Sequence, residues 1–327
     1  MPKNPELKNI LITDRFSQSG LSLLQSKSFL QISKSNDTSL HNHDVSEVHG
    51  LIIRSRTQID ESVLSRAKKL QVVITATSGF DHIDFKATKK WGITVMHAPN
   101  AHIESAAQLT WGLILSCASK MNTAHKQVKS GEWNRNLLVG AELYQKTLGI
   151  VGLGRIGKRV SEIGEVFGMK VIGYDPYIDD SAFKDCSVTR VSYEELLKSS
   201  DVVSFHVPKT QETISMLSAS QFAFINPKAI VINACRGGVI NEDDLCKALD
   251  QGLISACGLD VFGREPLDRN SKLLSFNNVV MTPHIGANTE RAFEKASHQS
   301  AEKLIAFFKD GTTSDVLPPK AAWFHLA

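Results

Sequence analysis

The stretch Leu148–Gly157, LGIVGLGRIG, decides the fold of the second half of this chain. A short apolar run enters three glycines with the spacing G-x-G-x-x-G, and residues 156–167 continue with helical periodicity. Gly152 would permit a tight turn, Gly154 would let a pyrophosphate approach the backbone, and Gly157 would let helix and strand pack closely. The first helical turn, with Arg155 and Ile156, would offer free N–H groups to phosphates. The pattern predicts a dinucleotide site.

An acidic residue at the end of the next strand is the second requirement of such a site. Asp175 lies 18 residues after Gly157, within the sequence Tyr174-Asp175-Pro176. Its carboxylate can accept hydrogen bonds from the adenosine ribose hydroxyls and would repel a 2′-phosphate. The pattern therefore predicts that NAD is preferred over NADP as the cofactor.

The rest of this half predicts a complete doubly wound sheet. Short apolar runs separated by helical stretches, such as 156–167 and 241–250, indicate six parallel strands. These strands are expected at 148–152, 170–175, 201–207, 229–233, 255–259 and 279–282.

The first third of the chain predicts a smaller parallel α/β unit. Strands are expected at 9–13, 50–54, 70–75 and 93–96, and helices at 17–26 and 61–69; a last helix at 291–309 returns to this unit. We therefore predict an α/β protein in which a Rossmann domain, residues 101–290, is inserted into a flavodoxin-like substrate domain, residues 1–100 and 291–327.

A long helical stretch lies near the predicted junction. Residues 104–130 are rich in Ala, Leu, Gln and Lys, with only Gly112 as a weak breaker. They predict one long helix or one bent helix, whose apolar residues could serve a subunit interface. A homodimer is the expected assembly.

Composition excludes several other classes of protein. A net charge of +3 over 327 residues gives no reason to expect nucleic acid or a membrane surface as a partner. The first ten residues lack the apolar stretch of a secretory signal, and no apolar run approaches membrane-spanning length. Five cysteines without a Cys-x-x-Cys pair favour a reducing, cytoplasmic location. His41 and His43 have no further ligand motif nearby, so no metal site is expected.

Three ionisable residues follow predicted strands of the second half and could converge beyond the carboxyl ends of the sheet. His284 suits a proton donor with a pKa near neutrality, and Glu265 suits the carboxylate that orients it. Arg236 suits a guanidinium that holds a substrate carboxylate and polarises the adjacent carbonyl. Together they suit the reduction of a 2-oxo acid, although each residue alone could equally be a loop residue without a catalytic role.

At these residues the chain resembles the D-isomer-specific 2-hydroxyacid dehydrogenase family over nearly its whole length. The resemblance implies catalytic roles for Arg236, Glu265 and His284, and a nicotinamide contact for Asp260. Ser78 and Gly79 match the loop whose N–H groups bind the substrate carboxylate. Further positions expected at the cofactor are His206, Val207 and Pro208 on the adenine side, with Thr213, Ala234, His284 and Gly286.

Within the family, the chain is most similar to members that oxidise 3-phosphoglycerate in serine biosynthesis. Arg54, Ser55 and Arg135 could bind the phosphate, or could be a surface charge and a helix cap. The alternatives are an unphosphorylated acid, glyoxylate or hydroxypyruvate, and an NAD(H)-sensing corepressor-like protein without turnover. No C-terminal regulatory domain is expected.

Four positions depart from the pattern of the relatives. Gln108 and Asn241 stand where glutamate and aspartate are common, and His97 replaces a common asparagine. Phe80 lies in the substrate loop where a smaller residue is usual, so its ring could narrow the substrate pocket.

Overall fold

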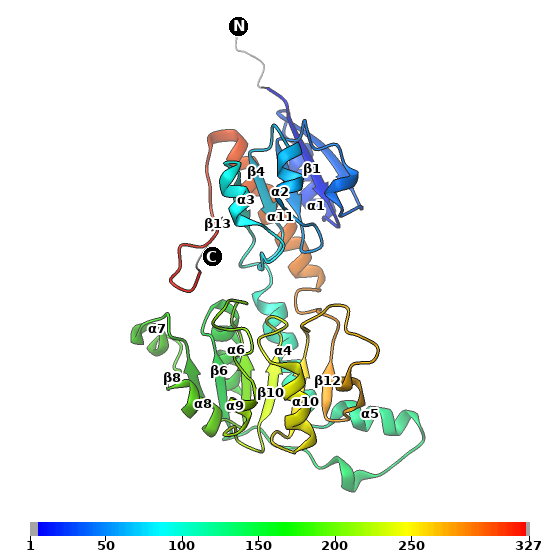
Figure 1. The fold of residues 1–327 in the computed structure, drawn as a ribbon, viewed down its shortest axis with the longest axis vertical. Helices are drawn as coiled ribbons and strands as arrows, with labels where there is room; N and C mark the ends of the chain where they lie inside the picture. The colour runs from blue at the N-terminus through cyan, green and yellow to red at the C-terminus, as the bar shows by residue number, and fades with distance from the viewer. Residues whose placement is uncertain (1–5, 325–327) are drawn as a thin grey trace. The chain divides into compact units, whose positions relative to one another are not determined.

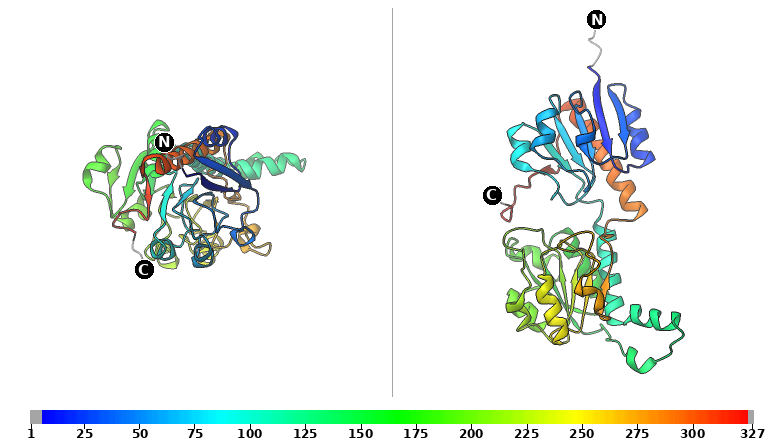
Figure 2. Two further views of the ribbon diagram at one scale, coloured as in Figure 1. Left: turned by 90° about the horizontal axis from the view of Figure 1, so that it is seen from above. Right: turned by 45° about the vertical axis from the view of Figure 1, so that its right-hand side comes forward.

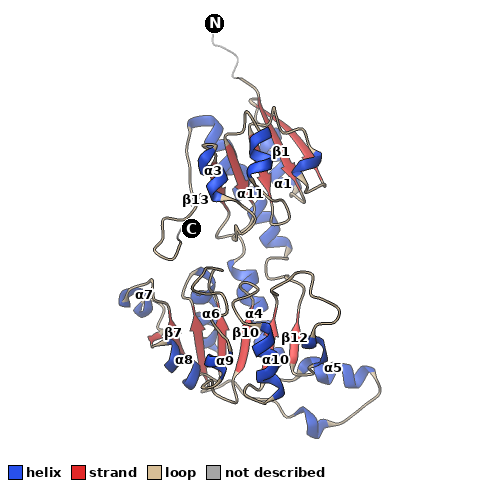
Figure 3. Ribbon diagram, viewed as in Figure 1, coloured by secondary structure: helices blue, strands red, loops and turns tan. Residues whose placement is uncertain are grey.

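The computed structural model describes residues 6–324, so residues 1–5 of the N-terminal stretch lie outside the described part. The chain divides into two compact units. Unit 1 comprises Met1–His102 and Asn288–Ala327, and unit 2 comprises Ile103–Ala287. Each is a sheet between helices (Figures 1 and 3).

Unit 1 is built on a six-stranded sheet in the order β13-β5-β4-β3-β1-β2. Its first five strands in sequence are all parallel in the order 5-4-3-1-2, which is flavodoxin-like. β13 pairs antiparallel with β5 at one edge. The strands are β1 (Lys8–Thr13), β2 (Leu30–Ser35), β3 (Gly50–Ile53), β4 (Val72–Thr75), β5 (Thr94–His97) and β13 (Val316–Leu317).

Helices cover both faces of this sheet because its strands are apolar on both sides. One buried cluster joins Val63, Leu64 and Phe85 to β3 and β4, and a second joins Leu24 and Leu304 to β1 and β3. The helices are α1 (Gln18–Gln25), α2 (Glu61–Arg66), α3 (Phe85–Lys90) and α11 (Glu290–Asp310), with a 3-10 turn at Leu40–Asn42.

Unit 2 is built on a seven-stranded sheet in the order β12-β11-β10-β9-β6-β7-β8. All its neighbours are parallel, and the strand order reverses between β6 and β9, as in a Rossmann fold. The strands are β6 (Thr147–Val151), β7 (Lys170–Tyr174), β8 (Thr189–Arg190), β9 (Val202–Phe205), β10 (Ile230–Asn233), β11 (Ala256–Leu259) and β12 (Val279–Met281).

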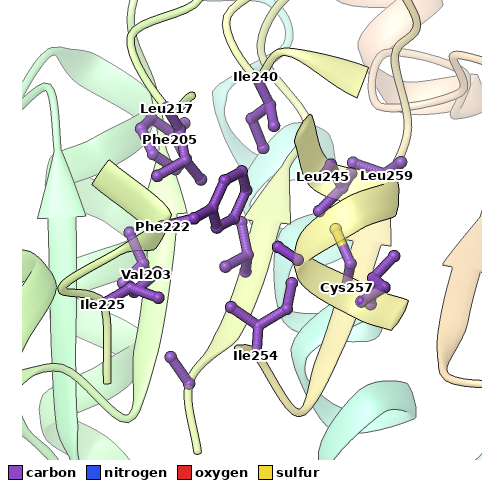
Figure 4. Close-up of a cluster of buried hydrophobic side chains, with 14 of the residues drawn as sticks. Val203, Phe205, Leu217, Phe222, Ile225, Ile240, Leu245, Ile254, Cys257 and Leu259 are labelled. Carbon is purple, nitrogen blue, oxygen red and sulfur yellow. The ribbon is translucent and has the colours of Figure 1, made fainter. Parts of the chain in front are cut away.

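The helices of unit 2 bury its sheet from two sides. Trp111, Ile114 and Val160 lie in the cluster on one face, and Phe222 lies in the cluster on the other, among Val203, Ile225 and neighbouring side chains (Figure 4). The helices are α4 (Ile103–Ala118), α5 (Met121–Lys129), α6 (Arg155–Val166), α7 (Asp180–Lys184), α8 (Tyr193–Ser199), α9 (Ala219–Phe222) and α10 (Glu242–Asp250), with 3-10 turns at Arg135–Leu138 and Lys272–Ser275.

The predicted helix over 104–130 is divided into α4 and α5, and Gly112 is not the breaking point. Lys120 takes a left-handed conformation with φ of 51°, and the N–H of Ala141 donates to the Ala118 carbonyl at 2.8 Å. That hydrogen bond satisfies a terminal carbonyl of α4 from a distant part of the chain, which the local sequence does not reveal. Most apolar residues of α4 are buried inside unit 2, whereas α5 buries none of its residues. Figure 2 shows α5 projecting from the body of unit 2.

The described helices include none that is both long enough and apolar enough to span a membrane.

Candidate active site

The glycine turn after β6 has the geometry that its sequence predicts. Gly152 has φ of 91°, and a Cβ atom there would lie 2.6 Å from the His206 carbonyl oxygen. A Cβ atom on Gly157 would lie 2.1 Å from the Gly152 oxygen, so any side chain would push α6 away from β6. Around Gly154, by contrast, a Cβ atom would meet nothing within 4 Å. Gly152 and Gly157 therefore lie tightly against other protein atoms, whereas the space around Gly154 is open to a ligand.

A dinucleotide fits this open side. Gly154 is the N-cap of the twelve-residue α6, and no acidic residue lies in the first helical turn with Arg155 and Ile156. The N–H groups there can bind phosphate. Asp175, directly after β7, accepts hydrogen bonds from the N–H groups of Leu153 at 2.9 Å and Tyr177 at 3.0 Å. Each carboxylate oxygen keeps a lone pair for a ribose hydroxyl.

The predicted adenine-side residues follow β9, beside the same turn. His206 donates its N–H to the Val151 carbonyl, and burial lowers the pKa of its imidazole to about 3, so the ring is neutral. The side chain of Val207 lies 2.8 Å from where a Cβ of Gly152 would be. Thr213 donates its hydroxyl to the Pro208 carbonyl at 2.6 Å and accepts the N–H of Thr210. The Thr213 hydroxyl thus holds the loop in shape.

The structure brings Glu265 and His284 together. His284 Nδ1 lies 2.7 Å from Glu265 Oε2, and the other carboxylate oxygen accepts the Phe262 N–H at 3.1 Å. His284 has φ of 55°, a left-handed conformation that is costly for a side chain with a Cβ atom. Its N–H donates to the Asp260 and Thr282 carbonyls, which hold it there.

Asp260 organises the turn that carries His284. Its side chain is only 1% exposed, and its Oδ1 accepts the Thr282 hydroxyl at 2.6 Å and the Ile285 N–H at 2.8 Å. Its Oδ2 accepts the Gly286 N–H at 2.9 Å. A contact with nicotinamide stays a prediction for Asp260, because its carboxylate already accepts three hydrogen bonds.

Arg236 follows β10, the strand next to β11, and its turn abuts the loop that contains Glu265. A Cβ atom on Gly237 would lie 1.7 Å from the Phe262 carbonyl oxygen, so this approach requires glycine. Asn233 braces the turn around Ala234 by donating to the Arg236 carbonyl at 3.0 Å and accepting the Cys235 N–H at 3.1 Å. Arg236, Glu265 and His284 therefore follow three adjacent strands, at the edge where those strands end.

Unit 1 places Arg54, Ser55, Ser78 and Gly79 after two adjacent parallel strands. Arg54 follows β3, its Nη1 atom is buried without a hydrogen-bond partner among residues 6–324, and its guanidinium lies 5.4 Å from the Phe293 ring centre. Ser55 is exposed in the same turn. Ser78 and Gly79 lie in the loop after β4, where neither N–H donates to an acceptor within the described residues.

Within unit 2, Arg135 lies toward the end of α4 that is opposite Gly286. α4 begins near Gly286, where Ala106 lies 3.9 Å from a Gly286 Cβ position, and it ends against the segment that follows Arg135. Sixteen helical residues span about 24 Å. Arg135 lies in the segment after α5, which projects from the body of unit 2 (Figure 2).

Residues 111–286 match the NAD-binding domain of the D-isomer specific 2-hydroxyacid dehydrogenases. The chain belongs to this family. D-3-phosphoglycerate dehydrogenase from Methanocaldococcus jannaschii is 38% identical over 296 residues, 90% of this chain and 56% of the relative. The Bacillus subtilis protein of the same name is 37% identical over 92% of this chain and 57% of its own length. The chain thus spans little more than half the length of these relatives.

A solved structure of the family covers the fold almost completely. D-lactate dehydrogenase from Aquifex aeolicus, in complex with NAD and lactic acid, superposes with a TM-score of 0.81 at 31% identity. The match covers 93% of this chain and 96% of that chain. The predicted α/β fold, the family and the NAD-binding domain of an oxidoreductase are confirmed.

Three residues around the site were missed by sequence reasoning. Asn233, buried at the end of β10, is signalled only by being polar in an apolar strand. Thr282 holds Asp260, and its role depends on a contact across strands. His102 lies 3.1 Å from the Ser78 hydroxyl, and burial, with the charges of Arg54 and Lys295, lowers its pKa to about 4. Within residues 6–324 no group of three or more His, Cys, Asp or Glu side chains could hold a metal ion.

The carboxylate of Asp175 should set the preference for NADH over NADPH. Asp175→Asn keeps an oxygen for the Leu153 N–H but removes the negative charge that repels a 2′-phosphate. We expect the ratio of the NADPH and NADH dissociation constants to fall about 10-fold or more, or about 1.4 kcal/mol. Fluorescence titration with NADH and with NADPH measures the two dissociation constants. An unchanged ratio would contradict the role of Asp175 in the choice of cofactor.

Proposed function

We propose that this chain is an NAD-dependent dehydrogenase that interconverts 3-phosphoglycerate and 3-phosphohydroxypyruvate, a reaction of serine biosynthesis. The cofactor supplies or takes the hydride at C2 of the acid. Unit 2 contributes the groups for proton transfer and for charge on the reacting oxygen, and unit 1 contributes the groups that bind the anionic ends of the substrate.

The hydrogen bond between His284 and Glu265 supports the proton-transfer role. Because Glu265 occupies Nδ1, the Nε2 atom of His284 is the one left to exchange a proton with the substrate oxygen. The carboxylate stabilises the imidazolium and fixes the ring plane. The guanidinium of Arg236, in the neighbouring turn, can stabilise negative charge on the same oxygen and bind the carboxylate.

The buried Nη1 atom of Arg54, which has no hydrogen-bond partner among residues 6–324, is the observation that best supports a phosphorylated substrate. An unsatisfied buried donor is costly, and burial lowers the pKa of this guanidinium from its ordinary value. A phosphate oxygen would accept a hydrogen bond from Nη1, and the phosphate would place a negative charge beside the guanidinium. His102, held neutral beside Arg54 by its low pKa, adds no competing charge. The N–H groups of Ser78 and Gly79 then remain for the carboxylate.

Two other functions stay open to the same fold. The D-lactate dehydrogenase of Aquifex aeolicus, solved with lactic acid, favours an unphosphorylated acid such as glyoxylate or hydroxypyruvate. A corepressor-like protein would bind NADH through the same glycine turn and turn over no acid. Turnover on a panel of acids separates all three.

Phosphohydroxypyruvate should be the preferred acid, and Arg54 should be the reason. In NADH-oxidation assays we expect its kcat/KM to exceed the values for hydroxypyruvate, glyoxylate and pyruvate. Arg54→Gln should lower kcat/KM for phosphohydroxypyruvate about 30-fold or more, because a charge-assisted hydrogen bond is lost, and should leave hydroxypyruvate within about 3-fold. Arg15→Gln is the matched control, since Arg15 stacks on the same Phe293 ring but is exposed. If Arg54→Gln lowered kcat/KM equally for phosphohydroxypyruvate and hydroxypyruvate, the assignment of Arg54 to the phosphate would be wrong.

His284 should be needed for turnover but not for binding of the cofactor. His284→Ala removes the proton donor, so we expect kcat to fall about 100-fold or more while the NADH dissociation constant stays within about 2-fold. Glu265→Gln should give a smaller loss of kcat, because the ring stays but the imidazolium is less stabilised. Stopped-flow kinetics measures kcat, and titration with NADH measures the dissociation constant. A kcat of His284→Ala equal to that of the wild type would contradict the acid–base role of His284.

We further propose a cytoplasmic homodimer that uses the segment from α5 through the 3-10 turn Arg135–Leu138. Trp133 is 78% exposed there, and four other large apolar residues are also exposed: Met121, Val128, Leu137 and Val139. Such a concentration of exposed apolar side chains is typical of an interface. Arg135 lies on the same segment, and we propose that it contributes to the substrate site of a second copy.

Light scattering should therefore find a dimer that Trp133→Asp converts to a monomer, because burial of a carboxylate in the interface is costly. Leu274→Asp is the control, since Leu274 is exposed elsewhere in unit 2. A monomeric wild-type protein would refute the assembly.

A further inference from the structure

The ring of Phe80, in the loop after β4, packs against other aromatic rings. It lies directly after Gly79 and meets Phe85 at 5.6 Å, Phe324 at 5.9 Å and Trp323 at 6.5 Å between ring centres. Phe324 also packs edge-on against Phe85 at 5.6 Å. Phe80 is thus anchored by aromatic neighbours of unit 1, and the narrowing of the substrate pocket by its ring stays a prediction.

His97, the second unusual residue of this region, contacts both the ring and the loop. Its imidazole lies edge-on to Phe80 at 5.9 Å, and its Nδ1 lies 3.0 Å from the Ser78 carbonyl oxygen. The hydroxyl of Thr77 donates to the Gly79 carbonyl at 2.7 Å. Both carbonyls of the Ser78-Gly79 pair are therefore held by protein donors. Their N–H groups are left to the loop's ligand.

The segment that carries Trp323 and Phe324 is fixed to the same edge of the sheet. α11 ends at Asp310, and β13 then pairs antiparallel with β5, placing Leu317 opposite Val95. The N–H of His97 donates to the Asp315 carbonyl at 3.2 Å. Because β13 is paired with β5, the residues that follow β13 lead to the aromatic group around Phe80.

We infer that Phe80, His97, Trp323 and Phe324, here called the aromatic clasp, are positioning residues for the substrate carboxylate. The clasp holds the loop after β4 so that the N–H groups of Ser78 and Gly79 stay directed at one point. The inference rests on the proposed function only in that a 2-oxo acid is bound by this loop. Phe80 and His97 contact one another, and His97 also contacts the Ser78 carbonyl.

The clasp predicts a particular kinetic defect. The loop binds a carboxylate that does not react, so its contribution is similar in the ground state and the transition state. Loosening the loop should raise KM and leave kcat nearly unchanged. The NADH affinity should not change, because its binding residues belong to unit 2.

Phe324→Ala and Trp323→Ala test the clasp, with Trp323→Phe as the rescue variant. We expect KM for the best acid of the panel to rise about 10-fold in the alanine variants, kcat to stay within about 3-fold, and Trp323→Phe to restore most of the loss. Phe307→Ala is the matched control. Its ring pairs edge-on with Phe308 at 5.2 Å and packs on the opposite face of the same sheet. It should leave KM unchanged.

Hydrogen exchange supplies a readout that needs no turnover. Amides of residues 77–83 should exchange faster in Phe324→Ala than in wild type, and at the wild-type rate in Phe307→Ala. Unchanged exchange there, or an unchanged KM in both alanine variants, overturns the clasp. If the wild-type protein reduces no acid, the proposed function fails by itself, and the exchange rates still decide whether the clasp holds the loop.

Discussion

The common direction of the strands is the constraint on which the site depends. In a parallel sheet every strand ends at the same edge, so the residues that follow successive strands gather there. The glycine turn follows β6, Asp175 follows β7, and Arg236, Asp260 and Thr282 follow β10, β11 and β12. Unit 1 repeats the arrangement with Arg54 after β3 and Ser78 after β4. Backbone topology thus collects residues that lie far apart in the sequence.

Most of this arrangement could be predicted because each feature has a local signal. Period, length and turn residues are sufficient to find the apolar strands, and G-x-G-x-x-G with Asp175 is sufficient to find the cofactor turn. The glycines prove necessary for reasons read from the sequence, namely the turn at Gly152 and the close packing at Gly157. β2 was missed because Lys34 and the two serines beside it obscure its apolar alternation, and β8 and β13 are only two residues long.

The features that escaped prediction depend on contacts between distant residues. The break at Lys120 follows from a hydrogen bond to Ala118 that Ala141 supplies, more than twenty positions further along the chain. Asp260 is expected at the cofactor by resemblance, and that role stays a prediction; the sequence did not indicate that its carboxylate also holds the turn of His284. The ring contacts of Phe80 with Trp323 and Phe324 join residues about 240 positions apart. No local pattern encodes such pairs.

The short antiparallel β13 also has a consequence for solubility. A sheet edge exposes unpaired N–H and C=O groups that can pair with another chain and start aggregation. β13 covers the edge of β5 with only two residues, and Pro318 and Pro319 follow at once, neither of which has an N–H to offer. The unit 2 sheet also ends in a two-residue strand, β8. On these sides each sheet therefore presents an edge strand of only two residues, which offers few groups for pairing with a further strand.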